Sequence, residues 1–173
     1  NSSDLKAEIS RYAVRLPFEG KSSAKITTST RRYRMDDNSS GILSTLFRFD
    51  SAGNCFLTFV TSSAIHNIPF GLDGWLHGMT DRTLSMARTA YPNSMGVTPV
   101  HTAGICSWTN ADQLSAFYLS MFNPGSEETF RFTFEGDKLK MEIVAPTGRR
   151  PGPPGMQQPE PVNLILTGTK MKD

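Results

Sequence analysis

Residues 129–134 read Thr-Phe-Arg-Phe-Thr-Phe, and this strict alternation predicts a β-strand. Successive side chains of a strand point to opposite faces, so the three phenylalanines share one face and the polar residues share the other. One face therefore meets a hydrophobic core and the other meets water. Residues 135–138, Glu-Gly-Asp-Lys, are typical of a tight turn, and the alternation resumes in residues 139–143. We expect a β-hairpin here.

The same pattern recurs along the chain. Two more hairpins are predicted, one with strands at residues 43–49 and 55–61, and one with strands at 100–108 and 114–122. Consecutive hairpins favour an all-β antiparallel meander, either closed into a barrel or folded into a sandwich. The remaining predicted elements are strands at residues 12–18, 24–34, 64–70 and 162–170, and weak helix signals at residues 4–12 and 80–90.

Length and charge narrow the class of protein. The 173 residues include 18 Lys+Arg and 16 Asp+Glu, which give a formal charge of +2. A typical domain has about 150 residues, so the length of the chain predicts a single domain over residues 1–173, and the strand pattern makes it a β-domain. So small a net charge does not favour binding to nucleic acid. No apolar run reaches the ~20 residues that a membrane span needs. We therefore expect a soluble domain that binds neither nucleic acid nor a membrane.

Residues 146–161 hold six of the eleven prolines and three glycines. Such a composition predicts an extended loop inserted between the last two strands of the domain. A Pro-rich ligand for a partner domain is the alternative interpretation of this segment.

Cys55 and Cys106 each lie in an apolar stretch. Two thiols do not make a disulfide framework, so both are predicted to be buried and free. A single bridge between neighbouring strands is the alternative, and the separation of the two Cα atoms decides between them.

Several short motifs follow one another in a familiar order. In chain order they are Leu16-Pro17, Gly20-Lys21-Ser22, Tyr33 with Asn38, Gly41 and Ile42, a Phe-rich hairpin, Ile68-Pro69-Phe70-Gly71-Leu72-Asp73-Gly74-Trp75, Ser107-Trp108-Thr109-Asn110-Ala111-Asp112, and the hairpin that contains Phe130. Together they resemble the C-terminal β-domain that follows the catalytic domain in bacterial serine hydrolases of the class C β-lactamase and penicillin-binding-protein family. The resemblance spans residues 16–144. It implies an antiparallel up-and-down barrel of the lipocalin or calycin type, with about 8–10 strands, and an accessory role.

Enzymes of that family use Ser-x-x-Lys, Tyr-x-Asn and Lys/His-Thr-Gly boxes. Ser22 with Lys25 and Tyr91 with Asn93 match the first two by spacing. However, the β-branched run that follows Lys25 suits a strand rather than the helix that would place Lys25 below Ser22. Neither Thr-Gly pair of the chain is preceded by Lys or His. We therefore expect no catalytic residue in this chain, while the resemblance implies that the full-length protein is a serine hydrolase.

Metal and acid–base chemistry find little support in the sequence. His66, His77 and His101 stand 11 and 24 residues apart, without the close pairs of zinc sites, and no metal or other cofactor is predicted. A haem held through one histidine is conceivable, but the spacing does not favour it. Glu127 and Glu128 precede the strand at 129–134, where two solvated charges at a turn are expected.

Aromatic side chains are the candidates for ligand binding. Each tryptophan is predicted near an end of the barrel, either as a structural plug or as a platform for a ligand. An open barrel would be lined by the phenylalanines of residues 129–134 and by the ring of one tryptophan. The candidate ligand-binding residues are Trp75, Trp108, Phe130, Phe132 and Phe134. The inward face of residues 114–122 is ambiguous, because both of its faces carry large apolar side chains.

Three functions follow as hypotheses. The first is a non-catalytic accessory domain that packs on a serine-hydrolase catalytic domain of the same or a neighbouring chain and shapes substrate access, which predicts an exposed apolar patch. The second is a free-standing barrel that binds a small apolar ligand in a cavity of roughly several hundred Å³. The third is an independent hydrolase that uses Ser22, Lys25 and Tyr91, whose side chains would have to converge. The compartment, bacterial cytoplasm or cell envelope, stays open.

Overall fold

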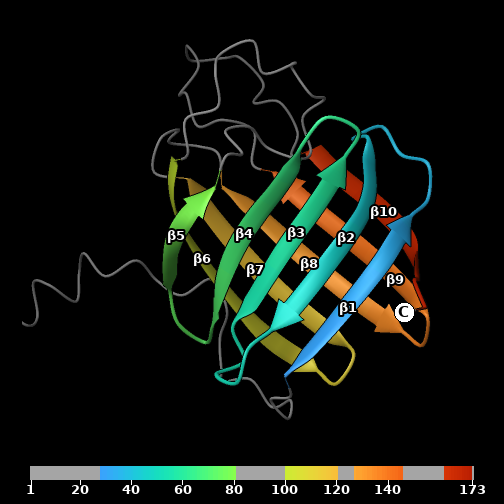
Figure 1. Cartoon of the computed structure of the whole chain (residues 1–173). Helices are drawn as coiled ribbons and strands as arrows, with labels where there is room; N and C mark the ends of the chain where they lie inside the picture. The colour runs from blue at the N-terminus through green and yellow to red at the C-terminus, as the bar shows by residue number, and fades with distance from the viewer. Residues whose placement is uncertain (1–27, 81–99, 121–126, 146–161, 173) are drawn as a thin grey trace, which may run out of the picture.

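The computed structural model describes residues 28–80, 100–120, 127–145 and 162–172, and these residues form ten strands without a helix (Figure 1). The strands are β1 (Ser29–Met35), β2 (Ile42–Phe49), β3 (Cys55–Thr61), β4 (Ile65–Leu72), β5 (Leu76–Thr80), β6 (Val100–Asn110), β7 (Gln113–Ser120), β8 (Glu128–Glu135), β9 (Lys138–Ala145) and β10 (Val162–Lys170). The described part of the chain contains no helix with the length and apolar character needed to cross a membrane.

The strands form one sheet that closes on itself. Neighbours in sequence pair antiparallel from β1 to β4 and from β5 to β10, and β1 pairs antiparallel with β10. The ring is completed by a short parallel pairing of β4 with β6, in which Gly71 lies opposite Ile105 and Leu72 opposite Cys106. Nine strands thus make the barrel wall, and β5 is an extra strand on β6. The predicted all-β barrel is confirmed, with one parallel pairing in an otherwise antiparallel meander.

Most of the predicted strands are confirmed apart from their end residues. β6 extends to Asn110, so its turn is shorter than expected, and β4 extends to Leu72. The sequence does not predict β5, because five residues with a central glycine are too few to show an alternation. The predicted strand at 12–18, the helix signal at 4–12 and the start of the strand at 24–34 lie outside the described residues. So does the helix signal at 80–90, apart from Thr80, which ends β5.

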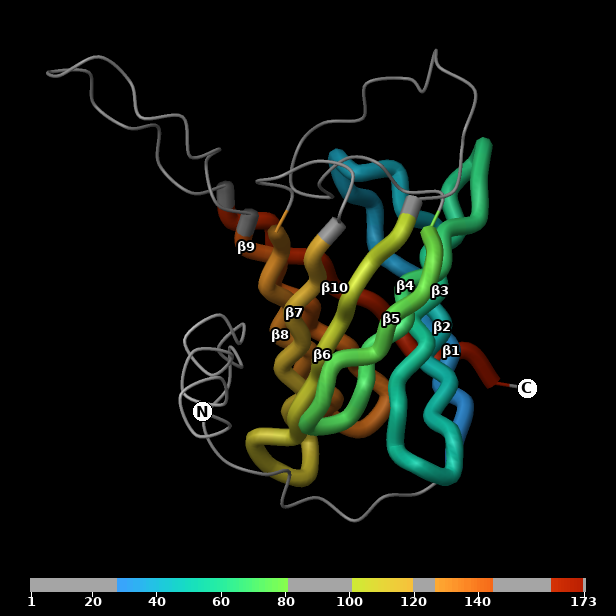
Figure 2. Tube along the Cα trace, turned by 90° about the vertical axis from the view of Figure 1, so that its left-hand side faces the viewer, coloured from blue at the N-terminus to red at the C-terminus, as the bar shows by residue number. Residues whose placement is uncertain are grey.

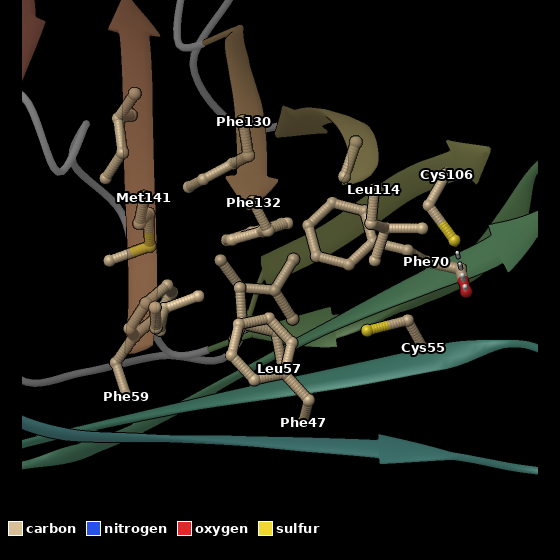
Figure 3. Packing of buried hydrophobic residues seen from close by; sticks show 14 of the residues in the cluster. Phe47, Cys55, Leu57, Phe59, Phe70, Cys106, Leu114, Phe130, Phe132 and Met141 are labelled. Carbon is tan, nitrogen blue, oxygen red and sulfur yellow. Dashed lines mark hydrogen bonds between the residues drawn. The ribbon is translucent and has the colours of Figure 1, made fainter. Parts of the chain in front are cut away.

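The core fills the inside of the barrel. β7 turns Leu114, Ala116 and Tyr118 inward, which resolves the ambiguity of that strand. Aromatic rings from opposite walls meet in the middle, as Figure 3 shows. The largest fully buried side chains of this interior cluster are Tyr33, Phe47, Phe59, Phe70, Phe130 and Phe132.

A glycine lets β4 approach β6 closely at the closing seam. Gly104 of β6 lies opposite Tyr118, an inward residue, so its own side-chain position faces inward. A Cβ atom there would collide with the carbonyl oxygen of Pro69 and would lie 2.9 Å from the ring of Phe70. Any residue with a side chain would therefore push β4 away from β6.

Hydrogen bonds fasten the end of β4 beyond this glycine. The backbone N–H of Asp73 donates to the carbonyl oxygen of Cys106 over 2.8 Å. Asp73 adopts the left-handed region, with φ 52°, which turns the chain from β4 toward β5. The N–H of Leu72 donates to the side-chain oxygen of Asn54 over 3.2 Å, so the β2–β3 turn supports the same seam.

β5 rests on the outside of β4. Pro69 alternates with the buried Ile68 and Phe70, so its ring faces outward. Gly78 of β5 lies over that ring, because a Cβ atom at Gly78 would be 2.5 Å from Cγ of Pro69. In Figure 2, β5 accordingly runs in front of β4 on the outer side of the barrel.

Replacing Gly104 with alanine tests the seam. We expect Gly104→Ala to lower the free energy of unfolding by about 1–3 kcal/mol, because the new methyl group overpacks the contact with Pro69. The matched control is Gly74→Ala, where the added Cβ meets only the carbonyl oxygen of Leu72 at 3.9 Å. Urea unfolding of both variants measures the difference, and equal stabilities would contradict the close approach of β4 and β6.

Candidate functional site

Three of the predicted ligand-binding residues lie inside the barrel. Phe130, Phe132 and Phe134 are 0%, 0% and 4% exposed, and the residues between them face outward. The alternation in residues 129–134 thus predicts their direction correctly. Figure 3 shows the rings of Phe130 and Phe132 among side chains from the opposite wall, including Phe47.

These rings contact one another at the place where a ligand would lie. The ring centroids of Phe47 and Phe132 are 5.0 Å apart at an interplanar angle of 81°, and Phe130 stacks on Phe132 at 5.8 Å. Phe70 meets Phe130 edge-on at 5.9 Å. Such distances are those of directly packed aromatic pairs. In the described interior, side chains therefore occupy the middle of the barrel.

Trp108 lies at one end of the interior, beneath an arginine. Its ring packs 5.8 Å from Phe134 and 5.6 Å from Phe49. The guanidinium carbon of Arg31 lies 4.8 Å from the Phe134 centroid and 5.7 Å from that of Trp108. A guanidinium over several ring faces is a favourable cation–π arrangement, so Arg31 closes this end. Burial raises the pKa of the nearby Tyr33 phenol, and the charge of Arg31 partly offsets that effect.

Trp75 does not join this group. Its ring lies 5.9 Å from that of Phe117 at an interplanar angle of 78°. Phe117 alternates with the inward Ala116 and Tyr118, so the contact lies on the outer side of β7. The structure therefore brings four of the five predicted residues together and places Trp75 on the other side of the wall.

The end opposite Arg31 carries buried polar groups. Glu128 is fully buried, which corrects the expectation of a solvated charge at a turn. The reason is its register, because Glu128 begins β8 on the same face as Phe130 and lies opposite the inward Tyr118. Thr102 of β6 is 1% exposed at the same end of the barrel.

Neither cysteine is poised for reaction. Cys55 and Cys106 are both free and 0% exposed. Burial raises the pKa of the Cys106 thiol to about 12, and it raises that of Cys55 well above its ordinary value. Both are therefore protonated and shielded at neutral pH, whereas nucleophilic cysteines are exposed thiolates. Ser22, Lys25 and Tyr91 lie outside the described residues.

The histidines lie on three different strands, His66 on β4, His77 on β5 and His101 on β6. Among the described residues, no group of three His, Cys, Asp or Glu side chains could hold a metal ion.

The outer wall contains a groove of about 400 Å³ between β5 and strands β2 to β4. We call it the outer groove. Its volume lies within the range of small-molecule sites. The residues that line it are Leu46, Arg48, Phe56, Thr58, Asn67, Ile68, Pro69, Leu76, His77, Gly78 and Met79.

Apolar side chains dominate the outer groove where an outer wall would normally be polar. Leu46, Phe56 and Pro69 are half-buried on its floor, and Met79 is 52% exposed at its side. The guanidinium carbon of Arg48 lies 4.6 Å from the centroid of Phe56. On the same floor, the hydroxyl of Thr58 donates to the side-chain oxygen of Asn67 over 2.7 Å.

Sequence reasoning missed this groove, although a signal was present. Residues 55–60, Cys-Phe-Leu-Thr-Phe-Val, are apolar on both faces of the strand, unlike residues 129–134. A strand with two apolar faces has a partner on each side. The position of β5, which forms the side of the groove, has no such signal.

The sequence matches no protein-family model and no curated protein.

The raised pKa of Cys106 predicts a pH dependence of stability. A thiol in the unfolded chain has a pKa of about 8.5. The buried, protonated thiol of the folded chain therefore contributes its full stabilisation below that pH. This contribution is lost as pH rises through the folded pKa of about 12. We expect the free energy of unfolding of Cys106→Ala to fall less than that of the unsubstituted chain between about pH 9 and 11.

Urea titrations across that range measure the difference, with Lys and Tyr titration common to both proteins. Ellman's reagent provides an independent check, because the folded chain should not react at pH 8 until denaturant is added. Identical pH profiles, or rapid labelling of the folded chain, would contradict the burial of the thiols.

Proposed function

We propose that this chain is a non-catalytic accessory domain of a serine hydrolase of the β-lactamase family, and that its outer wall packs against the catalytic domain. The observation that carries the proposal is the outer groove, which is lined by the exposed Met79 and by the half-buried Phe56 and Leu46. Apolar residues gathered at an exposed groove are typical of protein–protein contacts. The resemblance of residues 16–144 supplies the partner, a catalytic domain of the same or a neighbouring chain.

The packing of the interior supports an accessory role over a carrier role. A carrier of apolar ligands needs an empty cup, whereas Phe47, Phe130 and Phe132 contact one another in the middle of this barrel. Arg31 covers one end of the same interior. A filled barrel is a rigid body, and rigidity suits a domain that forms one wall of a substrate entrance.

The chemistry would then come from the partner. In the described part of the chain, the thiols of Cys55 and Cys106 are buried and protonated, so neither can act as a nucleophile at neutral pH. The barrel would act by position, as it narrows the approach to an active site that the catalytic domain provides.

Ligand binding at the end opposite Arg31 is the second candidate function. The fully buried Glu128 and the buried Thr102 favour it, because inward polar groups can orient a ligand whose remainder is apolar. Native mass spectrometry of the chain separates the two functions. A co-purified small molecule supports the carrier, and the mass of the chain alone supports the accessory domain.

A two-part experiment tests the accessory role. The source gene should encode a domain with Ser-x-x-Lys, Tyr-x-Asn and Lys/His-Thr-Gly boxes near this chain. Expressed as separate polypeptides, the two domains should associate in sedimentation velocity. Met79→Asp should weaken the association by about tenfold or more, because it places a charge in an apolar contact.

Ile165→Asp is the matched control, since Ile165 is 59% exposed on β10, away from the outer groove. It should leave the association unchanged. A gene without such a domain, or two domains that do not associate, would overturn the proposed function.

A further inference from the structure

β5 offers a strand edge beside the outer groove. It pairs with β6 along Leu76–Thr80. Among the described residues, no other strand is hydrogen-bonded to it. In an antiparallel ladder, alternate residues direct their N–H and C=O groups away from the partner strand. β5 therefore presents backbone donors and acceptors beside the groove, which is the property that lets an edge strand accept another strand.

The floor of the groove continues from this edge as a row across the barrel. The register places Arg48 of β2 opposite Phe56 of β3, and Phe56 opposite Pro69 of β4. Gly78 of β5 lies over Pro69. Neighbouring strands are about 4.8 Å apart, so a strand added to β5 on this side would lie above Phe56 and one strand away from Arg48.

The charge of this wall is one-sided. Of the four arginines on β1 and β2, Arg31 lies over the end of the interior, whereas Arg32, Arg34 and Arg48 are exposed. Strands β1 to β5 contain no Asp or Glu. On β8 and β9, by contrast, the carboxylate of Glu142 lies 3.5 Å from Arg131 and 2.6 Å from Lys140. The exposed guanidinium of Arg48 is held over the Phe56 ring at the edge of the groove. A carboxylate from a partner is the group that complements it.

We propose that the outer groove binds an extended, acidic segment of the partner by strand addition to the edge of β5. Backbone hydrogen bonds to residues 76–79 hold the segment. Its inward apolar side chains contact Phe56, next to the Pro69 ring that β5 covers, and one inward Asp or Glu forms a salt bridge with Arg48. This inference rests on the proposed function for the identity of the partner, because the segment would belong to the catalytic domain.

Strand addition explains features that a compact apolar ligand would not require. A small apolar molecule needs the floor but neither a backbone edge nor a cation. An extended peptide uses all three, with main-chain bonds for affinity and side-chain contacts on alternate residues for specificity. The side of the groove is a strand, and its far edge is Arg48.

A random dodecapeptide library displayed on phage, selected on the immobilised chain, tests the inference without the catalytic domain. We expect enriched peptides to carry apolar residues and one Asp or Glu at alternate positions, so that all of them lie on the same face of the added strand. The affinity of the synthetic peptide, measured by fluorescence anisotropy, should fall about tenfold with Arg48→Glu and should weaken with added salt. Arg131→Glu is the matched charge reversal on the opposite wall and should leave the affinity unchanged.

Amide hydrogen exchange of the complex locates the contact, because strand addition should slow exchange at those β5 amides that point away from β6. The same selection on the Arg48→Glu variant serves as the comparison. The inference would be overturned if the unsubstituted chain enriched no peptides that the variant does not also enrich. It would also be overturned if the peptides bound without slowing amide exchange in β5. Two domains that associate equally well with Arg48→Glu would overturn it too, while the accessory function would stand. Domains that do not associate would overturn the accessory function and the assignment of the segment to the catalytic domain, whereas strand addition itself would stand or fall with the peptide results.

Discussion

The close contact of β4 with β6 at Gly104 is the constraint on which the rest of this structure depends. The sheet can close only because no side chain separates Gly104 from the carbonyl oxygen of Pro69. The parallel pairing at the end of β4 and the Asp73–Cys106 hydrogen bond then join the two ends of the meander. Closure pairs the wall strands on both edges, which protects a β protein from edge-to-edge association.

This closure divides the molecule into an inside and an outside with different roles. The inside is filled by aromatic rings from opposite walls, and Arg31 covers one end over the rings of Phe134 and Trp108. β5 is not part of the closed ring of strands, because β4 pairs with β6 and completes the ring without β5. β5 therefore lies on the outer wall and forms the outer groove, where the proposed function and the further inference both reside.

Local alternation predicts much of this fold, and long-range geometry accounts for what it cannot predict. The pattern of residues 129–134 is sufficient to turn Phe130 and Phe132 inward, because side-chain direction in a strand depends only on parity. Parity also predicts the inward direction of Glu128, because it lies two residues before Phe130 on the same strand. Its charge alone led to the wrong expectation of a solvated turn. The parallel closure, β5 and the outward place of Trp75 depend on how distant strands meet, and no local pattern records that. For the groove, the two apolar faces of residues 55–60 indicate a partner on the outer wall, but the position of β5, which forms the side of the groove, has no such signal.

Residue-resolved amide hydrogen exchange of the chain alone tests the central claim, that β4 closes the barrel on β6 and that β5, among the described strands, is bonded only to β6. The account predicts that the amide of Asp73, bonded to the carbonyl of Cys106, exchanges as slowly as amides of the central strands. It also predicts that exchange along residues 76–79 alternates between slow and fast, because within the described part of the chain β5 is hydrogen-bonded to β6 along one edge. Fast exchange at Asp73, or uniform protection along β5, would contradict it.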